Sequence, residues 1–239
     1  TMLQRELSML PSLFGTLERG MEGEPAVTKE SVHHFCKQVS GSPLKRPAWF
    51  FDVAQQGEGV VDVTTHLVDL IQWECFPGQV IDWQSDICVL KARRWPTRIS
   101  LEQFARVTKL DQFPDYLKKD VDKDGMLNVY ANGEINYMLR GVHATVSVRW
   151  EFEPPAGAGD THSSVMKGTK AHIIIRQGAE QQYKPALYVE KAGSTTAAEL
   201  KEAVKEAVAE LELRYPGISL AQTLEGWQVV IPDSYNVGH

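Results

Sequence analysis

The sequence is poor in cysteine, has no surplus of positive charge and contains no long apolar run. Cys36, Cys75 and Cys88 are widely spaced and odd in number, which argues against a disulfide framework or a CxxC site, so we expect plain buried thiols. The net charge of -6 argues against binding of duplex nucleic acid, because such proteins usually present a basic patch to the phosphates. No stretch approaches the ~20 apolar residues that span a bilayer, so we expect no membrane span.

The common catalytic and nucleotide-binding motifs are also missing. The sequence has no GxSxG elbow and no catalytic cysteine signature, so hydrolase chemistry of the common kinds has no support. GEGVVD, residues 57–62, has the first two glycines of the dinucleotide fingerprint GxGxxG, but Asp62 stands in place of the third. A proline-punctuated loop precedes this motif instead of a strand. The chain therefore has no recognisable nucleotide site of its own.

Two motifs invite a metal interpretation, and neither supports it. DVDKDG, residues 120–125, opens like a calcium-binding loop, but Ala131 stands at the twelfth position, where such a loop needs a bidentate acid. His33 and His34 fall in a segment that we predict to be helical, where neighbouring side chains point about 100° apart and cannot share one ion. We therefore predict a solvated acidic turn, a surface or partly buried histidine pair, and no metal site.

The hydrophobic pattern places helices before strands. It predicts helices over about residues 2–20, 28–41 and 57–74, and strands from about residue 80 onward. Asn132-Gly133, between two alternating runs, indicates a tight hairpin turn. Thr196 and Glu199 form a capping-box pattern at the start of a late helix, and residues 218–232 predict a closing hairpin. Together these features predict an α+β fold with a mostly antiparallel sheet.

The segment GEGVVDVTTHLVDLIQWE, residues 57–74, carries a charged stripe among apolar residues. Asp62, His66 and Asp69 are four and three residues apart, which places them on one side of a helix. The other sides are rich in valine, leucine and isoleucine, so we expect protein to cover the helix almost all round. Charged groups there must be paired or must line a cavity. Histidine titrates near neutrality, which suits proton transfer by His66; the alternative is a core histidine bonded to Asp62 or Asp69.

At these residues the sequence resembles the glucose-fructose oxidoreductase/inositol dehydrogenase (Gfo/Idh/MocA) family of NAD(P)-dependent oxidoreductases. The family carries a pattern like GGGxLxDxGxHxxD at the start of a helix in its second domain. Glu58 and Thr64 depart from the pattern, because both stand where the family has glycine. PAWFFDVAQQGEGVVDVTTHLVDLIQWECFP and GAGDTHSSVMKGTKAHIIIRQG are similar to the carboxy-terminal half of a less studied branch of that family. The matching positions are Gly57, Glu58, Gly59, Val61, Asp62, Thr64, His66 and Asp69.

The resemblance implies that residues 1–239 form one substrate-binding and oligomerisation domain. Residues 1–20 would be the connecting helix from a Rossmann domain that lies outside this chain, and NAD or NADP would be bound mainly by that domain. The implied fold is a mostly antiparallel open sheet with helices packed on one face and a homo-oligomer contact on the other. Any export signal would lie upstream of Thr1, so the sequence leaves the compartment, cytoplasmic or periplasmic, open.

The resemblance also implies roles for the charged stripe. The histidine that matches His66 would accept the proton of a substrate hydroxyl while hydride passes to the nicotinamide. Asp62 would contact the substrate or the histidine, and Asp69 is a substrate-side candidate in the same stripe. A lysine from an EKP motif in the nucleotide domain would complete the site, and this chain has no such motif.

Three further substrate-side candidates follow from position alone. Trp49 and Asp52 precede the glycine turn, and His162 falls in the long glycine-rich loop predicted over residues 153–164. We therefore predict the substrate-binding part of an NAD(P)-dependent oxidoreductase that acts on a hydroxyl of a sugar or cyclitol, inactive as this fragment alone. The alternative is a ligand-binding or dimerisation module without redox chemistry, because the nucleotide motif is missing and the signature glycines are altered.

Overall fold

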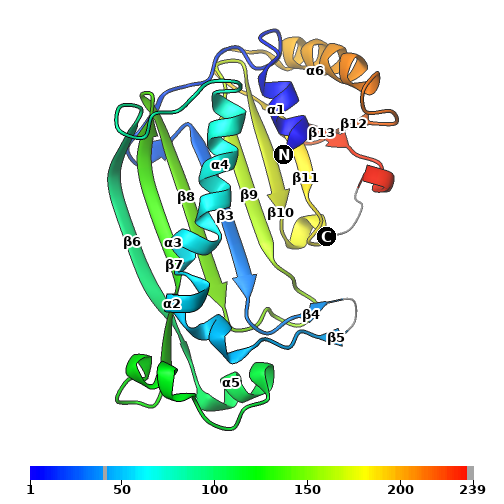
Figure 1. Ribbon diagram of the computed structural model, residues 1–239. Helices are drawn as coiled ribbons and strands as arrows, with labels where there is room; N and C mark the ends of the chain where they lie inside the picture. The colour runs from blue at the N-terminus through cyan, green and yellow to red at the C-terminus, as the bar shows by residue number, and fades with distance from the viewer. Residues whose placement is uncertain (40–41, 236–239) are drawn as a thin grey trace.

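The computed structural model describes residues 1–39 and 42–235, and its main feature is a nine-stranded sheet with helices on one face (Figure 1). Neighbouring strands are antiparallel except β3 and β8, which are parallel. The prediction of an α+β fold with a mostly antiparallel open sheet is confirmed. Across the sheet the strands are β12 (Ser219–Gln222), β13 (Gly226–Val230), β11 (Ala186–Lys191), β10 (Ala171–Gln177), β9 (Thr161–Lys167), β3 (Val27–His34), β8 (Val142–Glu151), β7 (Leu127–Leu139) and β6 (Ile87–Ile99).

The helices lie mainly in front of the sheet in the view of Figure 1. The longer ones are α1 (Met2–Ser8), α4 (Thr64–Cys75), α5 (Leu101–Thr108) and α6 (Ala197–Glu212), and the single-turn ones are α2 (Val53–Gln56) and α3 (Gly59–Asp62). Short 3-10 helices are η1 (Ala48–Phe51), η2 (Asp115–Asp120), η3 (Ala179–Gln181) and η4 (Asp233–Tyr235). Two small ribbons pair β1 (Gly20–Met21) with β2 (Glu24–Pro25) and β4 (Gln38–Val39) with β5 (Ser42–Pro43).

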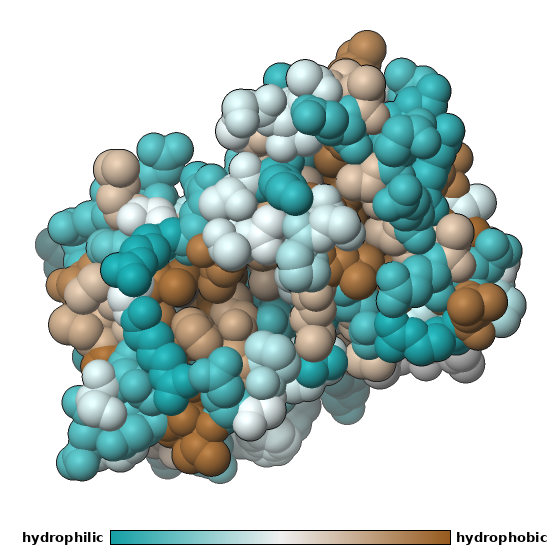
Figure 2. Space-filling model, turned by 90° about the horizontal axis from the view of Figure 1, so that it is seen from above, coloured by the Kyte–Doolittle hydropathy of each residue, from teal (hydrophilic) through white to brown (hydrophobic). Residues whose placement is uncertain are grey.

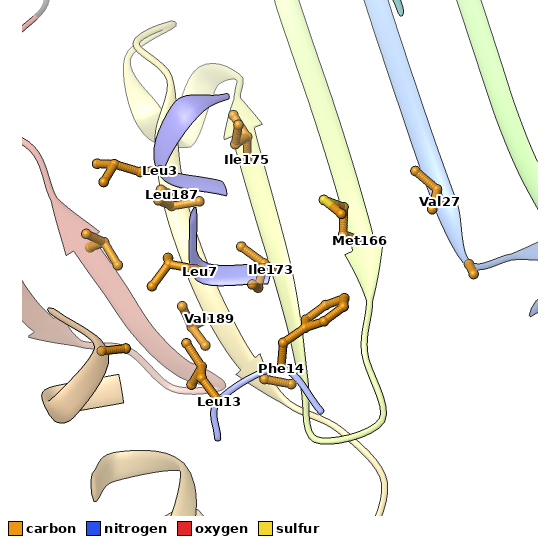
Figure 3. Close-up of a cluster of buried hydrophobic side chains, with 14 of the residues drawn as sticks. Leu3, Leu7, Leu13, Phe14, Val27, Met166, Ile173, Ile175, Leu187 and Val189 are labelled. Atoms are coloured by element: carbon orange, nitrogen blue, oxygen red, sulfur yellow. The ribbon is translucent and has the colours of Figure 1, made fainter. Parts of the chain in front are cut away.

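The apolar core divides into two clusters. The larger one fills the space between the sheet and α1, α4 and α6, and Figure 3 shows Leu3 and Leu7 of α1 beside Ile173 of β10 and Leu187 of β11. The smaller cluster is rich in phenylalanine and lies at the other end of the sheet, beneath η1 and α5. From above, the surface is largely hydrophilic, and apolar side chains are visible both in a central hollow and as separate groups at the edges (Figure 2). Burial of apolar area against one face of the sheet thus holds the helices in place.

The late helix and the closing hairpin match the sequence prediction. At the start of α6 the Thr196 hydroxyl accepts a hydrogen bond from the Glu199 amide at 3.2 Å, and the Glu199 carboxylate accepts one from the Thr196 amide at 2.7 Å. This capping box satisfies amides that have no partner inside the helix. The buried residues of α6 recur at helical spacing. Strands β12 and β13 form the predicted hairpin.

The first predicted helix is shorter than expected. It ends at Ser8, because Pro11 lacks an amide hydrogen and Gly15 adopts a positive φ of 74°, neither of which suits a continuing helix. Leu13 and Phe14 are nevertheless buried in the core. The periodicity of residues 2–20 therefore identified core residues correctly but the wrong backbone conformation beyond Ser8.

The helix predicted over residues 28–41 is wrong. Residues 27–34 form β3, and their side chains alternate between the two sides of the sheet. Val27, Lys29, Ser31 and His34 are the buried positions, so three of the four are polar. A half-buried strand is identified by apolar residues at every second position, and this pattern is missing here because polar residues stand at core positions.

The first predicted strand also begins later than expected. Residues 80–86 form turns, and β6 starts only at Ile87 as an edge strand with most side chains exposed. Cys88 on this strand is exposed, contrary to the expectation of buried thiols, whereas Cys36 and Cys75 are partly buried. All three cysteines are free.

The hairpin predicted at Asn132-Gly133 is wrong as well, because β7 runs through both residues without a turn. The Asn132 side chain instead fills an irregularity in the pairing of β6 with β7 near Pro96, which has no amide hydrogen to donate. Its amide nitrogen donates to the Trp95 carbonyl at 3.0 Å, and its oxygen accepts from the Trp150 amide at 2.7 Å. An asparagine that fills a bulge in the sheet therefore gave the same sequence signal as an asparagine in a hairpin turn.

Helix α3 lies directly on β7 through a pair of glycines. A Cβ atom added at Gly59 would overlap the Ala131 carbonyl oxygen, and one added at Gly133 would overlap the Val60 side chain. The backbones can therefore approach this closely only when both positions are glycine. This contact fixes where α3, and α4 behind it, begin.

Replacing Gly59 with alanine tests this contact. We expect Gly59→Ala to lower the free energy of unfolding by about 1–3 kcal/mol, because α3 must move away from β7 to make room for the methyl group. Urea denaturation measures the change. Gly159→Ala is the control, because its added Cβ would meet nothing closer than 3.5 Å. Equal stability of the two variants would contradict the close approach.

Candidate functional site

The glycine-rich segment before α4 is held by local contacts. The chain bends at Val63, between α3 and α4, and the Thr64 hydroxyl donates a hydrogen bond to the Gly59 carbonyl at 2.9 Å. The Glu58 carboxylate forms an ion pair with Arg94 of β6. Both residues that depart from the family pattern, Glu58 and Thr64, therefore anchor the turn. They preserve the geometry at the start of α4 by means other than glycine.

The charged stripe faces away from the sheet. Leu67 and Ile71 form the buried side of α4, whereas His66 and Asp69 are exposed and Asp62 is partly exposed. Within the part of the chain that the structure describes, these three side chains make no hydrogen bond or ion pair with one another. The predictions of a helix covered almost all round, and of a core histidine bonded to an aspartate, are therefore wrong. Sequence analysis expected the apolar residues of this segment to be buried, but some of them are exposed, such as Val61 at 59%.

An exposed imidazole flanked by carboxylates has a defined chemical capacity. His66 is exposed on α4, with Asp69 one turn later in the same helix and Asp62 at the end of α3, before the bend at Val63. An imidazole ring offers one nitrogen that can accept a proton and one that can donate a hydrogen bond. The stripe thus offers one proton carrier and two hydrogen-bond acceptors on a single face.

Arg46 lies next to this region, and sequence analysis did not identify it. The residue is only 8% exposed, and its guanidinium donates to the carbonyls of Phe35 and His34 at 2.7 and 2.9 Å and lies 4.2 Å from the centre of the Phe50 ring. Burial lowers the pKa of Arg46, while the charges of Asp160 and Asp62 oppose that shift. Among the described residues, no carboxylate forms an ion pair with it. Arg46 is therefore a buried cation held by two backbone carbonyls and an aromatic ring.

Trp49 and Asp52 have different surroundings. Trp49 is 47% exposed on η1, so its ring is available to a ligand. Asp52 is buried and caps α2, because its carboxylate accepts hydrogen bonds from the Ala54 amide at 3.1 Å and the Gln55 side chain at 2.8 Å. The bond from Gln55 is the main reason that the pKa of Asp52 is lowered. The structure thus gives Asp52 a local capping role and does not bring it into contact with the stripe.

His162 lies in β9 and not in the loop where sequence analysis placed it, because the strand begins at Thr161. Its Nδ1 atom lies 3.3 Å from the Ser31 hydroxyl, on the side of the sheet that the helices cover. Burial, with a smaller contribution from the charge of Lys29, lowers the pKa of His162 to about 4. The imidazole is therefore neutral at pH 7.

A second histidine cluster joins the end of β3 to the glycine-rich loop. The Asp160 carboxylate contacts His34 at 2.9 Å, His33 at 3.4 Å and the Lys37 ammonium. Burial would raise the pKa of Asp160, but the hydrogen bonds from these three donors outweigh it and hold the pKa well below its usual range. The helix assumed for residues 28–41 concealed this cluster, because it pointed His33 and His34 in unrelated directions.

The remaining sequence features are accounted for by local contacts. In the DVDKDG turn the Arg98 guanidinium contacts Asp122 at 2.7 Å and Asp124 at 2.8 Å, so an arginine neutralises the carboxylates that resembled a calcium loop.

No helix within the described residues is long and apolar enough to cross a membrane.

The face of the sheet opposite α4 contains a hollow of about 510 Å³. Its lining is polar and includes side chains from β3 and from β6 to β10. Two of its three arginines are paired within the chain, Arg93 with Glu134 and Arg176 with Glu190, both at 2.8 Å or less. Arg149 and Glu30 have no ion-pair partner among the described residues. This face thus presents unpaired charges of both signs.

The buried state of His162 predicts a pH dependence of stability. An unfolded histidine titrates near ~6.5, so between that pH and about 4 the unfolded chain binds a proton that the folded chain does not. Lowering the pH through this window should cost on the order of 2–3 kcal/mol from this residue alone, with no further loss below it. We expect His162→Gln to remove that part of the pH dependence in denaturation measured from pH 7 to pH 4. Ser163→Ala is the control, and an unchanged slope in His162→Gln would contradict a buried neutral imidazole.

Comparison with known proteins agrees with this architecture. A putative oxidoreductase from Parabacteroides merdae ATCC 43184 is 52% identical, with a TM-score of 0.95 over 100% of this chain and 54% of that chain. A putative oxidoreductase from Erwinia carotovora atroseptica SCRI1043 is 13% identical over 87% of this chain and 53% of that chain, with a TM-score of 0.48. KijD10, a 3-ketoreductase from Actinomadura kijaniata, is 11% identical over 88% and 50% of the two chains, with a TM-score of 0.40. No curated protein matches the chain.

The family assignment follows from a match over nearly the whole sequence. Residues 3–239 match the family described as "Putative oxidoreductase C terminal domain". The chain spans about half the length of the Parabacteroides merdae protein, at 54% of that chain. The prediction that the chain is the carboxy-terminal domain of a putative oxidoreductase is confirmed. The chain therefore belongs to the family of oxidoreductase carboxy-terminal domains.

Proposed function

We propose that this chain is the substrate-binding and oligomerisation domain of an NAD(P)-dependent oxidoreductase that acts on a hydroxyl of a sugar or cyclitol. The observation that carries the proposal is the exposure of His66 at the start of α4, on the side away from the sheet and between two carboxylates. Membership in a family of oxidoreductase carboxy-terminal domains supports it. The resemblance of residues 57–69 to the Gfo/Idh/MocA pattern supplies the reaction class.

In this proposal the residues of the stripe bind and deprotonate the substrate. One nitrogen of the His66 imidazole takes the hydroxyl proton as the carbon gives up hydride and becomes a carbonyl. Asp62 accepts a hydrogen bond from the substrate or orients the imidazole, and Asp69 accepts one from a neighbouring hydroxyl. Trp49 offers an apolar ring against the less polar side of a sugar. His162 lies on the sheet beneath the helices, so its role in substrate binding is the least direct.

The chain itself does not fit the phosphates of a dinucleotide. The turn at Gly57 and Gly59, which resembles part of the fingerprint, is already occupied by protein, because α3 lies against the Ala131 carbonyl there. NAD or NADP, which accepts hydride when bound, is therefore proposed to be held mainly by residues outside this chain. No step of the mechanism above depends on a cofactor contact from these 239 residues.

A second candidate function is a ligand-binding or dimerisation module without redox chemistry. The observation that favours it is the use of Glu58 and Thr64 as structural anchors at positions where the related pattern has glycine. In that case the stripe would bind a polyhydroxylated ligand but transfer no proton. Turnover by the full-length protein separates the two functions.

We also propose that the open face of the sheet joins two copies of the protein. Unpaired Arg149 and Glu30 on the same face can pair with each other across a two-fold axis, where each copy supplies one of each. The polar hollow on this face is then covered by the partner. The helices and the charged stripe remain accessible on the other side of the sheet.

Substitution of His66 tests the catalytic proposal. In the full-length enzyme we expect His66→Ala to lower kcat by about 100-fold or more, with a much smaller change in KM, because a proton acceptor acts mainly in the transition state. Steady-state kinetics with a panel of sugars and cyclitols measures both constants. His143→Ala, on the opposite face of the sheet, is the matched control. Unchanged kcat in His66→Ala would remove His66 from the mechanism.

A charge substitution tests the proposed oligomer. Ser147 lies on the open face, where its hydroxyl is 3.4 Å from the Glu30 carboxylate. We expect Ser147→Glu to shift the full-length protein toward monomer in analytical ultracentrifugation, because it adds like charge at the centre of the contact. Glu202→Lys on α6 serves as the control. An unaltered sedimentation coefficient for Ser147→Glu would argue against this face as the interface.

A further inference from the structure

A buried ion pair connects the end of α4 to the middle of the sheet. The Lys29 ammonium of β3 lies 2.7 Å from the Glu74 carboxylate of α4, and the two side chains are 1% and 0% exposed. Neither residue belongs to the charged stripe or to the pattern shared with Gfo/Idh/MocA proteins. Two opposite charges deep in the main apolar cluster require a specific explanation.

The pair is part of a polar network that reaches α1. The Lys29 ammonium also donates to the Ser164 hydroxyl of β9 at 2.7 Å, and that hydroxyl donates to the Gln4 side chain of α1 at 2.9 Å. The Gln4 amide nitrogen in turn donates to the Ile173 carbonyl of β10 at 3.0 Å. The network therefore links two helices, α1 and α4, to three adjacent strands.

The second contact between α1 and α4 lies nearer the surface. Arg5 donates to the Trp73 carbonyl at 3.3 Å, and its guanidinium lies 4.5 Å from the centre of the Trp73 ring. Because Trp73 precedes Glu74, the last turn of α4 is held from two directions. One contact comes from the sheet below and the other from the neighbouring helix.

Such a network specifies the position of the helix on the sheet more than it stabilises the fold. A buried ion pair repays little of its desolvation cost, and apolar residues of similar volume in its place are often as stable or more so. Leu67 and Ile71, the buried apolar side chains of α4, make non-directional contacts that tolerate a small rotation or slip of the helix, and the hydrogen bond of Thr64 holds only its first turn. An ion pair at 2.7 Å does not tolerate such a movement.

We propose that the Lys29–Glu74 pair is a positioning element that fixes the rotation and height of α4 on the sheet, and so determines where His66 points. Glu74 follows His66 by eight residues on one continuous helix, so the two side chains are ~12 Å apart along its axis and point about 80° apart. Rotation of α4 at Glu74 therefore moves His66 by the same angle. The part of this inference that concerns catalysis rests on the function proposed above.

The test replaces the pair by apolar residues in the full-length protein. We expect Lys29→Met/Glu74→Met to fold with an unfolding midpoint close to that of the parent, because the volumes are similar and no charge is left unpaired. Hydrogen exchange followed by mass spectrometry should then show amides of α4 exchanging at least tenfold faster, while those of β8 stay protected. Glu202→Met/Lys205→Met, which removes an exposed ion pair of 3.4 Å on α6, is the matched control.

A second variant covers the case in which the double substitution does not fold. Lys29→Gln/Glu74→Gln removes both charges and keeps a polar side chain at each position, so no charge is left unpaired, and we expect it also to raise exchange in α4 selectively. Unchanged protection of α4 in the folded variants would overturn the inference.

The effect of the ion pair on catalysis is measured separately, as kcat of the double variant. If His66 is the proton acceptor, kcat of the folded double variant should fall about tenfold, with KM nearly unchanged, because the base is misaligned rather than removed. The exchange result does not depend on any reaction. Faster exchange in α4 with full activity in His66→Ala would leave the positioning role intact and overturn the proposed function instead.

Discussion

The contact between α3 and β7 is the constraint on which the candidate site depends. Gly59 and Gly133 remove two side chains at the point where the helix backbone meets the strand, and the Ala131 carbonyl occupies the space that a Cβ would need. Once α3 lies there, the bend at Val63 directs α4 along the sheet over β3 and β8 (Figure 1). Leu67 and Ile71 then face the core, so Asp62, His66 and Asp69 must face outward.

This arrangement explains how a charged stripe exists in an apolar segment. The charges need no buried partner, because solvent or a ligand reaches them, and the desolvation cost expected for a covered helix does not arise. The buried charge of this region is instead the Lys29–Glu74 pair at the other end of α4. The helix therefore separates its two kinds of charge: the charges near its start are exposed, and the charge near its end is paired with the sheet.

Sequence analysis predicted most of what depends on local patterns. The capping box at Thr196, the closing hairpin and the helix of the charged stripe are set by neighbouring residues, and the α+β class follows from their order. Sequence analysis failed at positions where contacts between distant segments determine which residue is present. Lys29 and Ser31 are polar because of the network and the histidine beside them, so β3 resembled an exposed helix. Asn132 and Gly133 serve a bulge and a helix contact, so they resembled a turn. Arg46 and Asp160 have no motif, and only the fold brings them near Asp62 and His33.

We propose that the outward-facing His66 imidazole meets the substrate. Nuclear magnetic resonance of the full-length protein with labelled histidine, assigned by comparison with a His66→Gln variant, tests it directly. On addition of cofactor and a sugar or cyclitol substrate, we expect the ring resonances of His66 to shift while those of His143, on the opposite face, do not. A ligand that binds and leaves the His66 resonances unchanged would contradict it.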